Sequence, residues 1–285
     1  MSVSIRRATV DDAADLGRIC YQAFAKLAAT HGFAPDFPDP QTASGALSAL
    51  LGHESFYGVL AEVDGRTIGS NFLDQRAAIA GIGPITVDPA VQNAGIGRLL
   101  MEAVIARAEA QGTVGVRLVQ AAYHCRSLSL YSKLGFEVRE HLSCIQGPPI
   151  GMQTAGYTVR AAESRDVATC SALALRVHGH HRQRELQDAV SQGSATVVER
   201  AGLITGYASA IAFFGHAVAE STDDLKALIA ASKSFAGPGF LVPSRNGELL
   251  RWCLNKGLHI TQPMTLMTRG LYNNPVGAYL PSVIY

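Results

Sequence analysis

Residues 85 to 100 read Ile-Thr-Val-Asp-Pro-Ala-Val-Gln-Asn-Ala-Gly-Ile-Gly-Arg-Leu-Leu. This pattern predicts a strand, then a turn that contains Gln92-x-x-Gly95-x-Gly97, then an apolar helix. The start of a helix leaves several backbone N–H groups unpaired and carries a partial positive charge, so it attracts phosphate oxygens. Glycine lets the backbone come close to such a ligand. We therefore expect a cofactor that carries a pyrophosphate.

The residues after the glycines separate three kinds of glycine-rich turn. A P-loop has Gly-Lys-Ser or Gly-Lys-Thr, but Gly97 is followed by Arg98 and Leu99. A dinucleotide-binding turn has a third glycine where Leu100 stands. The remaining pattern, Gln-x-x-Gly-x-Gly followed by arginine, resembles the acetyl-CoA loop of the GCN5-related N-acetyltransferase (GNAT) superfamily.

A second segment strengthens this resemblance. A strand is predicted over residues 114–120, and the chain then reads His124-Cys-Arg-Ser127-Leu-Ser-Leu-Tyr131-Ser-Lys-Leu-Gly135-Phe. Its leucines predict a short helix that ends at Gly135 in the left-handed conformation. The segment resembles the GNAT pattern Asn-x-x-Ser-x-x-Leu-Tyr-x-Lys-x-Gly-Phe, except that His124 replaces the usual asparagine. An isolated Tyr131 would be read as a core aromatic, but beside the glycine turn we favour a functional role.

Composition excludes several classes of partner. The chain has 285 residues, of which 48% are hydrophobic and 16% charged, which suits a globular protein large enough for two domains. A net charge of +1 and scattered arginines disfavour nucleic acid. No apolar run approaches the ~20 residues that a membrane span needs. The sequence leaves a homodimer possible without predicting one.

The N-terminal residues and the cysteines indicate a cytoplasmic protein. Residues 3–8 predict a first strand and lack the long apolar stretch of a signal peptide. The cysteines are odd in number and form no Cys-x-x-Cys pair, so we expect reduced thiols; they are Cys20, Cys125, Cys144, Cys170 and Cys253.

The chain contains an internal repeat. Ile5-Arg-Arg-Ala-x-x-x-Asp12 is echoed by Val159-Arg-Ala-Ala-x-x-x-Asp166, and Glu62-x-x-Gly65-x-x-x-Gly69 by Glu199-x-x-Gly202-x-x-x-Gly206. Each pair predicts a strand leading into a helix, followed by a hairpin with a glycine turn. A linker rich in proline and glycine lies between the copies. We predict a mixed α/β (α+β) fold with two tandem acyltransferase-type domains, residues 1–147 and 156–285, each a twisted mixed sheet flanked by helices.

The second copy lacks the functional features of the first. Aligning Lys133-Leu-Gly-Phe with Asn255-Lys-Gly-Leu places Cys253 at the position of Tyr131 and Asn246 at that of His124. The second copy has no Gln-x-x-Gly-x-Gly; it has Ser221-Thr-Asp-Asp224, where Ser221 or Thr222 can cap a helix and two carboxylates would repel pyrophosphate. We expect this copy to be structural or to shape the acceptor pocket.

The resemblance implies acetyl transfer from acetyl-CoA to an amine, by direct attack on the thioester. Backbone N–H groups of the glycine turn would hold the pyrophosphate, and the strand before it would pair with the pantetheine amides. A free N–H near Val87 would face the developing oxyanion, and Tyr131 would protonate the departing thiolate. The implied cofactor-binding residues are Ile85, Thr86, Val87, Gln92, Asn93, Ala94, Gly95, Ile96, Gly97, Arg98, His124, Ser127 and Tyr131.

The general base stays open among three candidates. Asp74 ends a predicted strand, although such a carboxylate is commonly just solvated. His124 has a suitable intrinsic pKa, about 6.5, and is equally explained as a cap or core contact. The third candidate is the C-terminal carboxylate of Tyr285, because the tail from Tyr279 is apolar and should be buried.

Two further segments have alternative readings. Residues 31–40, His-Gly-Phe-Ala-Pro-Asp-Phe-Pro-Asp-Pro, suit either a semi-rigid lid over a cationic or aromatic amine or a packed surface loop. His178, His180 and His181 have no carboxylate or thiol at ligand spacing, so we predict no metal and read them as part of a solvated helix face.

The favoured interpretation is an acetyl-CoA-dependent N-acetyltransferase acting on a small-molecule or peptide amine. The alternative is a non-catalytic acyl-CoA-binding or regulatory protein. In that version, His124 in place of asparagine and the lack of any Glu or Asp in the strand predicted over residues 78–87 are signs of lost chemistry. A nucleotide-binding module is disfavoured by the missing lysine and serine or threonine after the glycines.

Overall fold

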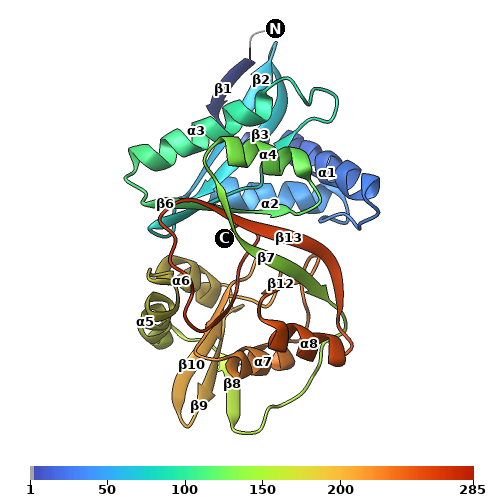
Figure 1. Ribbon diagram of the computed structural model, residues 1–285. Helices are drawn as coiled ribbons and strands as arrows, with labels where there is room; N and C mark the ends of the chain where they lie inside the picture. Colours follow the sequence, from blue (N-terminus) through green and yellow to red (C-terminus); the bar gives the residue numbers. More distant parts are fainter. Residues whose placement is uncertain (1–2) are drawn as a thin grey trace.

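The computed structural model describes residues 3–285, and the first half of the chain builds one sheet with helices on both faces (Figure 1). Its elements, in order, are β1 (Val3–Arg7), α1 (Ala13–Thr30), α2 (Pro40–Gly52), β2 (Phe56–Val63), β3 (Arg66–Asp74), β4 (Ile79–Ile82), β5 (Thr86–Val87), α3 (Ile96–Ala110), β6 (Gly115–Ala121), α4 (Cys125–Lys133) and β7 (Glu137–Gln146).

The second half repeats this order in shortened form. Its elements are β8 (Tyr157–Ala161), α5 (Val167–His178), α6 (Gln183–Ser191), β9 (Thr196–Arg200), β10 (Leu203–Ala208), β11 (Ala217–Ala219), α7 (Thr222–Ala231), β12 (Phe240–Pro243), α8 (Gly247–Asn255), β13 (His259–Gly270) and β14 (Ala278–Leu280). Short 3-10 turns, Val10–Asp12 and Ser164–Asp166, precede α1 and α5. The mixed α/β class and the repeat are therefore confirmed, while the boundary between two domains stays a prediction.

Strand pairing joins the halves. The larger sheet has the order β1-β2-β3-β4-β6-β13-β7-β12, with β5 paired to β3. Strand β13 of the second half lies between β6 and β7 of the first, and β7 in turn pairs with β12 of the second. In Figure 1, β7 and β13 cross the middle of the molecule. The second sheet has the order β14-β11-β10-β9-β8.

Alternation along the strands creates a core on each face of the first sheet. Phe72 packs with residues of α1 and α2, whereas its neighbour Leu73 packs with residues of α3 and α4, because successive strand side chains point to opposite faces. Tyr131 belongs to the α3/α4 side, and the chain end at Tyr285 is buried in a third cluster between the halves. The expected burial of the tail is confirmed.

Local glycine signals place the turns as expected. Gly65 and Gly202 have φ of 75° and 77° in the equivalent hairpins, and Gly135 and Gly257 both have φ of 85° after α4 and α8. Only glycine adopts such backbone conformations without steric cost. The expected single strand over residues 78–87 is interrupted after Ile82, so that Ile85 lies outside both β4 and β5.

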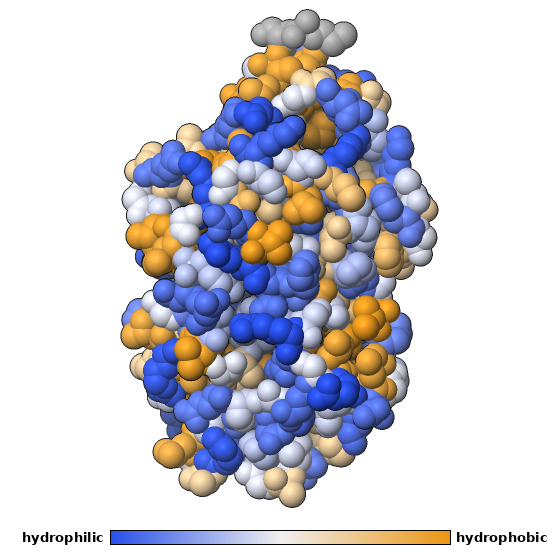
Figure 2. Space-filling model, in the orientation of Figure 1, coloured by the Kyte–Doolittle hydropathy of each residue, from blue (hydrophilic) through white to orange (hydrophobic). Residues whose placement is uncertain are grey.

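The surface is mixed in character. On the face in Figure 2, hydrophobic residues form small groups among hydrophilic ones, as is ordinary for a protein surface. Within residues 3–285, none of the helices combines the length and the apolar character needed to span a bilayer.

Candidate active site

The first feature of the site is an opening between two strands of the first sheet. Strand β4 pairs in parallel with β6 only as far as Gly81 and Arg117. Strand β5 then pairs with β3 alone, while β6 continues to Ala121 and is bonded on its other edge to β13. The edge of β6 that faces β5 therefore has backbone groups available to a ligand.

The pairing of β5 with β3 determines the direction in which the backbone N–H of Val87 points. Asp88 donates its N–H to the carbonyl of Ile68 at 2.8 Å, and Val87 lies opposite Gly69. In an antiparallel pair hydrogen-bonded and non-hydrogen-bonded positions alternate, so the N–H of Val87 points away from β3 toward the opening. Its carbonyl, on the same side, accepts from Gln92 Nε2 at 3.2 Å.

The glycine turn presents unpaired amides at the start of α3. Gly95 is the residue before the helix, with φ of 79°, and Asn93 has φ of 72°. Within the described part of the chain, the N–H groups of residues 93–97 donate to no backbone carbonyl. Gly97 lies close to Leu130 of α4, since a Cβ there would be 3.5 Å from Leu130 Cδ2. The turn thus has the open amides and positive helix end that a pyrophosphate requires.

Arg126 holds this turn in place. Its guanidinium donates to Asn93 Oδ1 at 2.8 Å and to Gln92 Oε1 at 2.7 Å. Arg126 was not predicted as a site residue, although it lies inside the second motif, one residue before Ser127. Arg98 is instead paired with Glu102 on the exposed surface of α3, at 3.2 Å.

Tyr131 lies within the core below the turn. Its ring is 6.2 Å from that of Phe136 and packs in the cluster that contains Ile96 and Leu100 of α3. Burial raises the pKa of Tyr131, because the charged phenolate would lose its hydration. The hydroxyl therefore stays protonated at neutral pH and can donate a proton.

His124 precedes α4 and is half-buried. Burial lowers its pKa, and the positive charges of Arg126 and His31 lower it further. Its ring makes no capping bond, but its carbonyl accepts from Ser127 Oγ at 2.9 Å. The same hydroxyl lies 2.8 Å from Gln120 Oε1, so its single proton is shared between the two acceptors, and Gln120 Nε2 is buried without a partner among the described residues.

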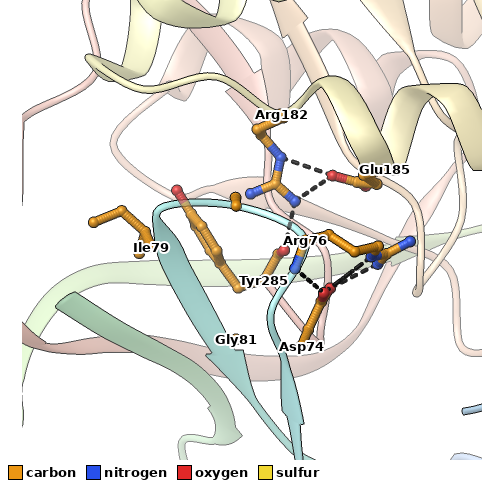
Figure 3. Close-up of a pocket in the computed structure, with 8 residues that line it drawn as sticks. Asp74, Arg76, Ile79, Gly81, Arg182, Glu185 and Tyr285 are labelled. Atoms are coloured by element: carbon orange, nitrogen blue, oxygen red, sulfur yellow. Dashed lines mark hydrogen bonds and ion pairs between the residues drawn. The ribbon is translucent and has the colours of Figure 1, made fainter. Parts of the chain in front are cut away.

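The other two candidate bases lie together at a small cavity lined by residues from both halves of the chain (Figure 3). Asp74 accepts from Arg76 Nη2 at 2.6 Å, and the Tyr285 backbone oxygen accepts from Arg182 Nη2 at 2.5 Å. Arg182 also donates from Nε to Glu185 at 2.8 Å. The cavity measures about 10 Å³, room for roughly one water molecule. The oxygens of both candidate bases therefore accept hydrogen bonds from arginines. Asp74 and Tyr285 line this cavity, and the structure does not bring these two residues to the opening beside β5.

The predicted solvated histidine face is wrong for two of its three histidines. His178 and His180 are buried, as is Arg182, whereas His181 is exposed. The ring centroids of His178 and His216 are 5.1 Å apart, and Tyr285 lies within the same group. Sequence spacing could not show this, because the burial depends on the tail packing over α5 and α6 from the far end of the chain.

In the second half, side chains cap the helix start that corresponds to the phosphate-binding turn of the first half. Ser221 caps α7 by accepting from the Asp224 N–H at 3.3 Å, and Asp224 accepts from the Ser221 N–H at 3.0 Å. Cys253 is the seventh residue of α8, as Tyr131 is of α4, and both are buried. Here a capping box satisfies the helix start, and a thiol replaces the phenol.

Comparison with known proteins agrees with this geometry. The family model of the acetyltransferase (GNAT) domain matches residues 53–138. No curated protein matches the sequence. A proposed acetyltransferase from Pyrococcus horikoshii superimposes with a TM-score of 0.74 at 17% identity, covering 97% of this chain and 94% of that one.

Two further solved structures match over nearly the whole chain. A GCN5-related N-acetyltransferase from Sphaerobacter thermophilus gives a TM-score of 0.62 at 16% identity, with 95% and 96% of the two chains covered. A tandem GNAT protein from the clavulanic acid biosynthesis pathway gives 0.56 at 12% identity, with 94% and 98% covered. At these identities the structures show the fold. The chain therefore has the fold of these solved acetyltransferase structures over nearly its whole length, and its residues 53–138 match the acetyltransferase (GNAT) domain.

Proposed function

We propose that the first half of the chain transfers the acetyl group of acetyl-CoA to a primary amine by direct attack on the thioester. The observation that carries this proposal is the opening between β5 and β6, with unpaired amides at residues 93–97 at one end and Tyr131 in the helix below. Acetyl-CoA would supply the activated acyl group. The second half, whose helix start is capped by its own side chains, would bind no cofactor.

Each residue then has a defined task. The amides of the glycine turn bind phosphate oxygens, and Arg126 keeps the turn in shape by holding Gln92 and Asn93. The N–H of Val87 points into the opening and stabilises negative charge on the attacked carbonyl. Tyr131 donates a proton to the departing sulfur, and the proton that the amine nitrogen releases as the amide forms passes to water.

The first experiment is calorimetric titration of acetyl-CoA, CoA and ATP into the wild type, Gly95→Asp and Gly95→Asn. We expect one CoA site per chain and no ATP binding. Gly95→Asp should abolish CoA binding because its carboxylate would repel the pyrophosphate. Asparagine is nearly isosteric with aspartate but uncharged, and it also tolerates a positive φ. Gly95→Asn should therefore retain most of the affinity for CoA. Absent CoA binding in the folded wild type would refute the proposal.

A second candidate is a non-catalytic acyl-CoA-binding protein. The observation in its favour is that Asp74 and the Tyr285 oxygen are both held by arginines. Tight CoA binding with no transfer to any amine in a chemically varied library would select this candidate over the enzyme.

A further inference from the structure

Asp36, in the segment between α1 and α2, is a shielded carboxylate that has no arginine partner. Among residues 3–285, every fully buried carboxylate has one: the pairs are Asp74–Arg76, Asp88–Arg66, Glu140–Arg245, Asp166–Arg160, Glu185–Arg182 and Asp224–Arg200. Asp36 is half-buried, and desolvation raises its pKa. Its only hydrogen bond among these residues comes from Gln262 Nε2, to Oδ1 at 3.1 Å.

An aromatic group lies next to the hydrogen-bond partner of this carboxylate. Phe33 stacks on Tyr123 with ring centroids 4.4 Å apart, and His31 lies 5.0 Å from the same tyrosine ring. The Tyr123 hydroxyl donates to Gln262 Oε1 at 3.0 Å. One strand residue, Gln262 of β13, therefore ties the segment between α1 and α2 to the loop after β6.

The second half of the chain adds a further aromatic residue. Phe214, between β10 and β11, is 42% exposed, and its ring lies 6.4 Å from that of the buried Phe37. Gln262 also belongs to the second half. The surroundings of Asp36 are thus built jointly by both repeats.

A carboxylate in such a place is costly without a counter-charge, because burial removes hydration that one hydrogen bond does not replace. Aromatic faces attract cations, and Oδ2 of Asp36 has no partner in the described chain. We propose that Asp36 binds the ammonium group of the acceptor, and that the acceptor is a primary amine carrying an aromatic or apolar group. Gln262 is a positioning residue that orients the carboxylate.

The position suits an acceptor, and the inference rests on the proposed acetyl transfer. Tyr123 immediately precedes His124, the residue before α4, and Arg126 in the first turn of that helix holds the phosphate-binding turn. One short stretch of chain, residues 123–126, therefore contacts both the partner of Asp36 and the phosphate-binding turn. The proposal concerns binding of the protonated amine, before any chemical step.

The test is calorimetric binding to the CoA-saturated protein, with 2-phenylethylamine and its neutral analogue 2-phenylethanol as probes. The wild type should bind the amine roughly 10- to 100-fold more tightly than the alcohol. Asp36→Asn should remove most of that preference. Asp39→Asn, in the same segment, is the matched control: Asp39 caps α2 by accepting from the Thr42 N–H at 2.7 Å, and asparagine caps a helix equally well.

The outcomes separate this inference from the proposed function. Equal binding of amine and alcohol by the wild type, or an undiminished preference in Asp36→Asn, would overturn the role of Asp36, while the CoA titration of the same samples reports on the cofactor site. Gln262→Leu removes a hydrogen bond that favours the ionised carboxylate. Its amine binding should therefore decline with acidification at a higher pH than in the wild type. An unshifted pH profile would exclude the positioning role.

Discussion

At the scale of single residues, Tyr131 combines a buried ring with a hydroxyl that burial keeps protonated. Replacing it with phenylalanine preserves the packing and removes only the proton donor. We expect Tyr131→Phe to lower kcat by roughly 100-fold, the lower range for loss of a general acid, with acetyl-CoA affinity almost unchanged. Steady-state kinetics and calorimetry together check this, with Tyr57→Phe, a partly buried tyrosine of β2, as control. Full turnover in Tyr131→Phe would remove Tyr131 from the mechanism.

Arg126 acts at the same scale but through the shape of the turn. Arg126→Ala would leave the side chains of Gln92 and Asn93 without their shared donor, so the turn would sample other conformations before binding. We expect acetyl-CoA affinity to fall roughly 10-fold, about the value of one charged hydrogen bond. The exposed Arg18→Ala, whose partner Asp15 lies on α1, should bind as the wild type does. Unchanged affinity in Arg126→Ala would mean that the turn is rigid without it.

At the scale of elements, features set by neighbouring residues could be predicted from the sequence, whereas features set by contacts between distant segments could not. The glycine turn, α4 with its stop at Gly135, and the capped start of α7 were predictable because their signals lie within a few residues. The insertion of β13 between β6 and β7 was not, since it pairs segments more than a hundred residues apart. The same reason applies to Tyr285, whose oxygen accepts from Arg182, 103 residues away in the sequence.

The packing of the tail against β4 gives a prediction at this scale. A Cβ on Gly81 would collide with the carbonyl oxygen of Ile284. Gly81→Ala should therefore lower the free energy of unfolding by about 1–3 kcal/mol, the usual cost of overpacking. Gly45→Ala is the opposite case, because Gly45 lies in α2 with open space around it. It should stabilise the protein by about 0.5–1 kcal/mol. Urea unfolding measures both changes. An unchanged free energy of unfolding in Gly81→Ala would show that the tail shifts to accommodate the added Cβ.

At the scale of the whole molecule, the exchange of strands makes the halves one cooperative unit. Removing β13 would leave β6 paired only with β4 and β7 only with β12, and would split the larger sheet in two. A buried group of His178, His180, His216, Arg117 and Tyr285 lies between the halves. Losing the contact between the halves would therefore expose these rings, and unfolding should occur in a single transition.

The histidines in this group make the stability of the whole molecule sensitive to acid. Burial lowers the pKa of His178 and His216 well below 6.5, and that of His180 to about 3, with nearby Arg182 acting in the same direction. The unfolded chain thus binds more protons below pH 6.5, so stability is complete above that pH and declines as the pH falls toward the folded values. Each histidine contributes up to about 1.4 kcal/mol per pH unit. His216→Leu should reduce the slope of unfolding free energy against pH by about that amount between pH 6 and 5, whereas the exposed His259→Leu should not. Equal slopes in His216→Leu and the wild type would show that His216 is already protonated in the folded protein.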